Sequence, residues 1–133
     1  MARGHAQHQA RAAQLKSFGK DLARREKSKC ELCELGGQTL EIVELPPVPR
    51  DPDFGRSLLL RRNCADAVPQ EKQFRGGDHW RFLAQSVWSE VPAVQALALR
   101  FLRRQEDTQA WAREALETAF VDEEVERMAA EAG

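Results

Sequence analysis

Cys30-Glu31-Leu32-Cys33 is the stretch of this chain that decides its fold. A pair of turn glycines follows it, and the segment 38–45, QTLEIVEL, is rich enough in β-branched and apolar residues to predict a short strand. The prolines between residues 46 and 52 exclude regular structure there. The segment 57–62, SLLLRR, predicts a returning strand, and Cys64 follows it. We therefore expect a cysteine knuckle, a two-stranded hairpin and a further cysteine brought back beside the knuckle.

A knuckle, a hairpin and more cysteine after the second strand is how a zinc ribbon or a treble clef is built, with two Cys-x-x-Cys pairs completing a tetrahedron. Here the second pair is incomplete, because Arg61 stands where its first cysteine is expected. The knuckle is also imperfect, since Glu34 follows it where a glycine would ease the turn. The pattern predicts a degenerate zinc-binding site whose metal ligands are Cys30, Cys33 and Cys64.

Over about residues 22–128 the chain resembles the PhnA-type zinc-ribbon proteins of bacteria. The segments that carry the resemblance are KCELC (29–33), LEIVELPP (40–47), LLL (58–60), DHWR (78–81), SVWSEVPAVQ (86–95) and FVDEE (120–124). In that family two Cys-x-x-Cys pairs bind zinc, so the resemblance implies that Cys30, Cys33 and Cys64 match ligands and that Arg61 does not. The family has no settled biochemical function, so the resemblance implies a fold more than an activity.

Three states of the cysteine cluster are open. Zinc would be held by three thiolates and a fourth ligand, from water or from Asp66, Glu34 or His79. Without metal, the cysteines would be buried reduced thiols. The knuckle pair could also form a redox disulfide, although the βαβ pattern of thioredoxin-like proteins is absent. An inward-pointing charge on Arg61 would oppose a dication, whereas an outward-pointing one would matter little.

Helical periodicity surrounds the hairpin on both sides. A basic helix is predicted over residues 6–28, weakened by Gly19, and three or four helices are predicted in the C-terminal half. The predicted helix starts are Asp78, Pro92 in a first turn with Ser89 as the cap, Asp107 or Thr108, and Asp122. Apolar side chains of these helices, among them all three tryptophans and Phe120, are predicted to lie in the core.

The expected fold class is therefore α+β, mostly α. A degenerate zinc-ribbon or treble-clef-like knuckle and hairpin (29–68) is flanked by a basic N-terminal helix (1–28) and a C-terminal helical bundle (69–133) that packs with it as one domain. The length of 133 residues suits one domain.

The formal net charge of −1 conceals a strong polarity along the chain. Residues 1–29 carry eight basic and two acidic side chains, whereas residues 105–133 carry nine acidic and two basic ones. The ends are either solvated helix faces that attract each other or, in the basic arm, a nucleic-acid contact. That alternative predicts a nucleic-acid-binding adaptor that uses Arg24, Arg25, Lys27, Arg61 and Arg62.

Several catalytic classes lack their residues in this sequence. A nuclease of the HNH type needs a histidine base on the hairpin, but the strand reads Glu41-Ile-Val-Glu44. No serine has a glycine-elbow context, and the glycine pairs are isolated turns rather than phosphate loops. We expect a protein that is not an enzyme: an interaction or regulatory module with an unknown protein partner or a second copy of itself.

The compartment is predicted from cysteines and hydropathy. Three cysteines are an odd number, which disfavours a disulfide framework and suits the reducing cytoplasm. No apolar run approaches the roughly 20 residues that span a membrane, and residues 1–14 lack the apolar stretch of a signal peptide. We therefore expect a cytoplasmic protein without membrane contact.

Overall fold

A two-stranded antiparallel sheet lies in the middle of the chain in the computed structural model, which describes residues 2–25 and 29–131. Strand β1 (Leu40–Glu44) pairs with β2 (Ser57–Arg61), and the register places Leu40 opposite Arg61 and Glu44 opposite Ser57. Both predicted strands are present, each slightly shorter than expected. The sheet is small, and helices make up most of the remaining regular structure, so the α+β, mostly helical class is confirmed.

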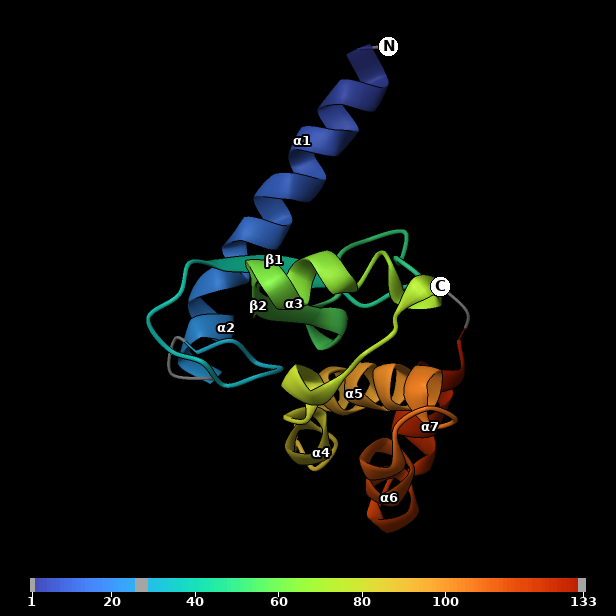
Figure 1. Cartoon of the computed structure of the whole chain (residues 1–133). Helices are drawn as coiled ribbons and strands as arrows, with labels where there is room; N and C mark the ends of the chain where they lie inside the picture. The colour runs from blue at the N-terminus through green and yellow to red at the C-terminus, as the bar shows by residue number, and fades with distance from the viewer. Residues whose placement is uncertain (1, 26–28, 132–133) are drawn as a thin grey trace.

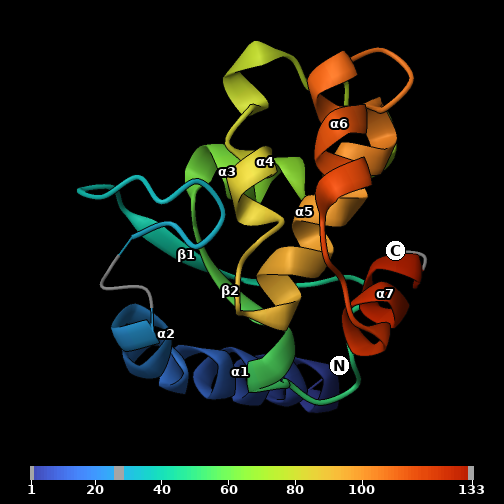
Figure 2. The same ribbon diagram turned by 90° about the horizontal axis from the view of Figure 1, so that it is seen from below.

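Helices and short 3-10 turns flank the sheet (Figures 1 and 2). Helix α1 projects away from the sheet, whereas α5, α6 and α7 gather on the side opposite to it. The elements outside the sheet are α1 (Ala2–Ser17), α2 (Gly19–Arg25), η1 (Phe54–Arg56), α3 (Arg62–Ala67), η2 (Glu71–Gln73), η3 (Asp78–Trp80), α4 (Leu83–Ser86), α5 (Pro92–Gln105), α6 (Ala110–Thr118) and α7 (Glu123–Ala130).

The N-terminal helix predicted over residues 6–28 is two helices, because the chain turns at Phe18 before α2 begins at Gly19. The predicted end at residues 26–28 lies outside the described part of the chain. Arg11 ties α1 to the hairpin, since its guanidinium binds the Glu44 carboxylate and donates to the carbonyl oxygen of Pro49 at 2.9 Å. In α2, Leu22 is fully buried.

Helix α5 supplies the centre of the core. Its predicted apolar face is confirmed, because Val94, Leu97, Ala98, Phe101 and Leu102 are all buried. Helices α4, α6 and α7 pack against α5, and one continuous cluster joins it to the buried leucines of β2. The cysteine region and the helical region therefore share one core.

The predicted helix starts are partly correct. Pro92 is in the first turn of α5, and the Asp122 carboxylate accepts a hydrogen bond from the Val125 N–H at 3.0 Å, which caps α7. Asp78 begins a 3-10 turn without a side-chain cap, and Gln109 rather than Asp107 or Thr108 precedes α6. Ser89 accepts from the Val91 N–H, one residue before α5, so it orders the linker instead of capping the helix.

Two aromatic side chains that were predicted in the core are exposed. Trp88 retains 54% of its accessible surface and Phe120 retains 79%. The predicted helices were too long at these points: α4 ends at Ser86 and α6 ends at Thr118, so both aromatics lie on linkers. Trp80 and Trp111 are half-buried and pack against the core, as expected.

Arg100 is a buried cation that periodicity did not predict. It lies on the core side of α5 and retains only 4% of its accessible surface. Its guanidinium donates to the carbonyl oxygens of Met128 at 2.9 Å and Ala129 at 3.3 Å, at the end of α7. Burial lowers the pKa of this guanidinium, and the Glu71 carboxylate partly offsets that effect. Arg100 thus satisfies carbonyl groups that a helix end leaves unpaired.

Candidate metal centre

The fold brings Cys30, Cys33 and Cys64 together, although 34 positions separate the first from the last. Cys30 and Cys33 lie in the turn before β1, and Cys64 lies in the first turn of α3, directly after β2. Their sulfur atoms are all within 4.8 Å of one another. Cys30 and Cys64 are fully buried and Cys33 is half-buried, and all three are free thiols.

The turn that carries the knuckle closes on itself through its backbone. The Glu34 N–H donates to the Cys30 carbonyl oxygen at 2.8 Å, and the Cys30 N–H donates to the Leu35 carbonyl oxygen at 3.2 Å. Glu34 adopts a φ of +64°, a left-handed conformation that glycine would adopt at lower cost. Glu34, at the position where a glycine would ease the turn, therefore has a strained backbone.

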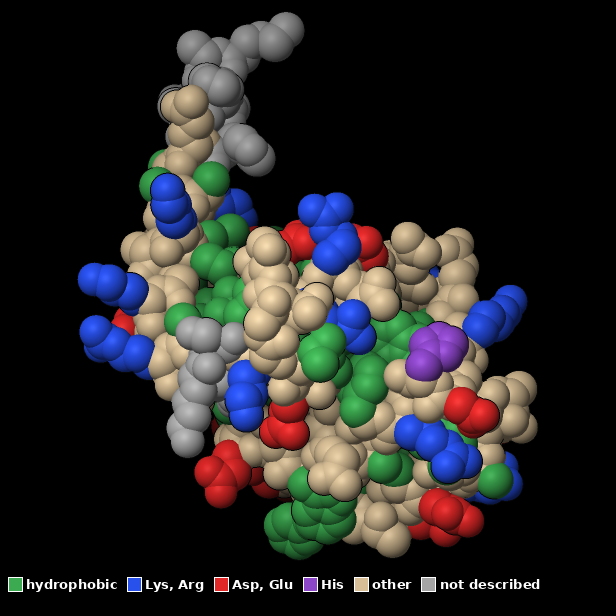
Figure 3. All heavy atoms as spheres, turned by 60° about the vertical axis from the view of Figure 1, so that its left-hand side comes forward, with side chains coloured by type: hydrophobic (Ala, Val, Ile, Leu, Met, Phe, Trp, Pro, Cys, Tyr) green, Lys and Arg blue, Asp and Glu red, His purple; other side chains and the backbone are tan. Residues whose placement is uncertain are grey.

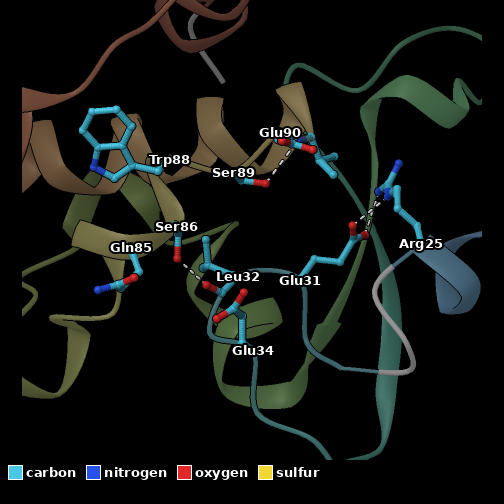
Figure 4. Close-up of a pocket in the computed structure, with 10 residues that line it drawn as sticks. Arg25, Glu31, Leu32, Glu34, Gln85, Ser86, Trp88, Ser89 and Glu90 are labelled. Atoms are coloured by element: carbon cyan, nitrogen blue, oxygen red, sulfur yellow. Dashed lines mark hydrogen bonds and ion pairs between the residues drawn. The ribbon is translucent and has the colours of Figure 1, made fainter.

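Glu31 docks the knuckle onto the second strand. Its N–H donates to the Leu59 carbonyl oxygen at 2.9 Å, and its carboxylate accepts from the Leu59 N–H at 2.8 Å. Arg25 neutralises this buried carboxylate with two hydrogen bonds of 2.8 and 2.7 Å. Figure 4 shows the pair at one side of a cavity. The buried position of Glu31 was not predicted from the sequence, because a carboxylate between two cysteines is ordinarily expected in solvent.

Arg61 points toward the sulfur atoms. Its Nε donates a hydrogen bond to Cys33 Sγ at 3.0 Å. This hydrogen bond and the neighbouring thiols raise the pKa of the Arg61 guanidinium. The residue that stands in place of a fourth cysteine therefore contributes a cation to the cluster.

Cys30 and Cys64 behave as one coupled pair. A hydrogen bond from Cys64 lowers the pKa of Cys30 to about 5. The same hydrogen bond, together with burial, raises the pKa of the Cys64 thiol. The hydrogen bond between the two sulfur atoms thus favours the thiolate form of Cys30 and the protonated form of Cys64. A thiolate is the form of cysteine that binds metals.

None of the side chains predicted as a fourth ligand joins the sulfur atoms. Glu34, Asp66 and His79 are all exposed, and within residues 2–25 and 29–131 the group at metal-ligand spacing contains only the three cysteines. A tetrahedral metal here would need a ligand that the described residues do not supply. The site thus has three sulfur donors and one adjacent guanidinium.

The basic residues of the nucleic-acid alternative do not share one surface role. Arg25 binds buried Glu31, and Arg61 binds Cys33. Arg62 is exposed and forms an ion pair with Glu41 at 2.7 Å. Arg24 is exposed beside Asp21, and Lys27 lies outside the described residues. Figure 3 shows Lys and Arg side chains on the projecting N-terminal segment as well as on the body.

Comparisons with known proteins found no significant match, so the function is inferred from the geometry of the site. No protein-family model matches the chain, and no curated protein or solved structure is significantly similar to it. Within the part of the chain that the structure describes, no helix has the length and apolarity needed to cross a membrane.

Proposed function

We propose that this chain is a non-catalytic, PhnA-like interaction module in which Cys30, Cys33 and Cys64 hold a structural zinc ion. The observation that supports it is the convergence of three sulfur atoms within 4.8 Å, from two segments that the hairpin separates. Zinc–sulfur bonds of about 2.3 Å in a tetrahedron place sulfur atoms roughly 3.8 Å apart. A small contraction of the cluster would satisfy that geometry.

The charges of the site also fit zinc. Three thiolates around a dication leave one negative charge, and the Arg61 cation neutralises it. A thiolate that binds a metal still accepts hydrogen bonds, and such outer contacts commonly orient the ligand. The 3.0 Å contact from Arg61 Nε to Cys33 Sγ is therefore compatible with a bound metal.

The metal would supply stability to a region that needs it. A two-stranded sheet alone is marginally stable in water, and a bound ion that joins the knuckle to α3 would hold the two strands together at the open end of the hairpin. Among the described residues no histidine or carboxylate accompanies the sulfur atoms. A water molecule bound there would therefore lack a neighbouring base, which favours a structural role over hydrolysis.

Native mass spectrometry on protein purified without a histidine tag tests the proposal. We expect a single zinc ion per chain, and a lower melting temperature after chelation. Cys64→Ser should lose the ion, whereas Thr39→Ser, an exposed change near the knuckle, should keep it. If the purified chain contains no zinc and chelation does not change its melting temperature, the proposal of a structural zinc ion is rejected. A catalytic turnover found in a broad hydrolase and phosphonatase screen, and lost in Cys64→Ser, would reject the non-catalytic role.

A further inference from the structure

Two cavities adjoin on the face between the knuckle and the C-terminal helices. One has a volume of about 360 Å³ and lies between the knuckle and the α4–α5 linker. The other has a volume of about 370 Å³ and lies between that linker and the α6–α7 linker. Trp88, Ser89 and Glu90 line both cavities, so the two adjoin along this linker, and together they are called the Trp88 groove below. Both cavities are open, which suits an extended ligand better than an enclosed small molecule.

The backbone segments that carry the exposed aromatic side chains of this groove are held in place. The Gln95 side-chain amide donates to the Val87 carbonyl oxygen at 2.7 Å and to the Phe120 carbonyl oxygen at 3.0 Å. It therefore ties the two linkers that carry Trp88 and Phe120 to each other. The Asp122 cap fixes the α6–α7 linker from its other end. These large apolar side chains are presented to solvent by a defined backbone, and exposed apolar surface of this kind marks interaction sites.

The charge of the groove selects its ligand. Arg25 and Glu31 neutralise each other within it. Its other charged lining residues are all acidic: Glu34, Glu90 and Asp122. Neither Glu34 nor Glu90 forms an ion pair with a described residue, whereas Asp122 is engaged in its cap. Figure 4 shows Glu34 and Glu90 on opposite sides of the first cavity, with the Trp88 ring directed to one side.

We propose that the Trp88 groove binds an extended peptide segment of a partner protein, one that carries a lysine or arginine beside a bulky apolar residue. This inference rests on the proposed function as an interaction module and names the chemistry of its partner. The cation would lie between the carboxylates of Glu34 and Glu90, neither of which forms an ion pair with a described residue. The apolar residue would cover Trp88 and Phe120, and aromatic anchors of this kind dominate the energetics of interfaces. A nucleic acid is disfavoured, because the net charge of the groove is negative.

Isothermal titration calorimetry with defined peptides tests the assignment. The probe is an acetylated octapeptide that alternates leucine and lysine. One matched peptide replaces each lysine with glutamate, and another replaces each leucine with serine. We expect the leucine–lysine peptide to bind at least about tenfold more tightly than either matched peptide. Failure of the leucine–lysine peptide to bind, or equal binding of the serine peptide, would overturn the assignment.

Variants of the chain locate the binding site. Trp88→Ala and Phe120→Ala should each weaken binding about tenfold or more. The double variant Glu34→Gln/Glu90→Gln should weaken it and flatten its dependence on salt. Val48→Ala and Glu117→Gln remove an exposed apolar group and an exposed charge at residues that line neither cavity, and should leave binding unchanged. Equal losses in these controls and in the groove variants would overturn the proposal.

Two further measurements separate the remaining explanations. Zinc content should be the same in the groove variants and the parent chain, so a loss of peptide binding in those variants with zinc retained would support the groove. A parent chain that holds zinc and does not bind the leucine–lysine peptide would count against the groove alone. Absence of zinc with peptide binding intact would count against the metal alone. Sedimentation of the free chain should show a monomer. A concentration-dependent dimer that Phe120→Ala abolishes would overturn the peptide assignment and identify a second copy as the occupant.

Discussion

The helical half of the molecule and its cysteine half bury their side chains by different means. Helix α5 buries mainly apolar side chains around Phe101. Contacts between apolar side chains are not directional, so their strength depends on how well the shapes fit. The knuckle buries a carboxylate, Glu31, and thiols, each with a particular partner. In the first region stability follows the volume that fills the core. In the second region stability depends on specific pairs of polar groups, so the loss of one group leaves its partner buried without a hydrogen bond.

The largest expected effect is in the helical half. Phe101→Ala should lower the free energy of unfolding by about 3 to 5 kcal/mol, because it leaves a cavity in the centre of the core. Urea denaturation followed by circular dichroism measures this change. The matched variant Phe120→Ala alters an exposed phenylalanine and should shift stability by less than about 0.5 kcal/mol. Similar losses in both would show that hydrocarbon burial does not distinguish the two positions.

The cysteine half should be most sensitive at Glu31. Glu31→Ala should cost about 2 to 3 kcal/mol, because it leaves the Leu59 N–H and the Arg25 guanidinium without their partner. Glu31→Gln keeps an acceptor for the Leu59 N–H and should cost less. A double-mutant cycle with Arg25→Met measures the coupling. Additive losses would mean that the ion pair contributes nothing to the docking of the knuckle.

Arg61→Cys would add a fourth sulfur atom to the cysteine half. We expect zinc to bind about tenfold more tightly or better, equivalent to about 1.4 kcal/mol, because another thiolate ligand joins the site. Competition with a chromophoric chelator measures the affinity. Arg62→Cys places a thiol at the neighbouring exposed position and should leave it unchanged. An unchanged affinity in Arg61→Cys would show that this position does not face the metal.

The smallest expected effect concerns the end of the helical half. Asp122→Ala should cost about 1 kcal/mol, because it removes the cap of α7. Hydrogen exchange should accelerate at the Val125 amide, which loses its acceptor. Asp107→Ala, a change at a residue that caps no helix, should leave exchange in α7 as it was. Equal exchange in both variants would show that packing against α5 alone holds the first turn of α7.

Local sequence patterns predicted where helices and strands form better than they predicted which side chains are buried. The strands, the apolar face of α5, the position of Pro92 and the cap at Asp122 all follow from short-range rules and were predicted correctly. Helix α3 was missed, since its residues 62–67 are too few for an apolar period and no side chain caps it. Trp88 and Phe120 were placed on helical stripes, but the helices end before them.

The sequence predicted that the three cysteines of the candidate site come together, but not which side chains contact them. The knuckle, the hairpin and Cys64 lie in sequence order, so the convergence of the cysteines follows from strand pairing. The direction of Arg61 was left open, because a side chain at the end of a strand can face either way. Buried charges are hardest to predict, since Glu31 depends on Arg25 and Arg100 depends on carbonyl groups about 30 positions later.

The contacts of Arg100 have a consequence for synthesis of the chain. This guanidinium lies inside the core, yet its acceptors are carbonyl groups of residues 128–131. While a ribosome still holds those residues, α5 carries a cation that lacks its carbonyl acceptors and has, among the described residues, only the Glu71 carboxylate, 3.7 Å away in the folded chain, as a partner. The central helix would therefore settle only after residue 131 is free, even though proteins generally begin folding from the N-terminal side during translation. Chains that stop before residue 128 should be more prone to aggregation and proteolysis than chains that include residues 128–131.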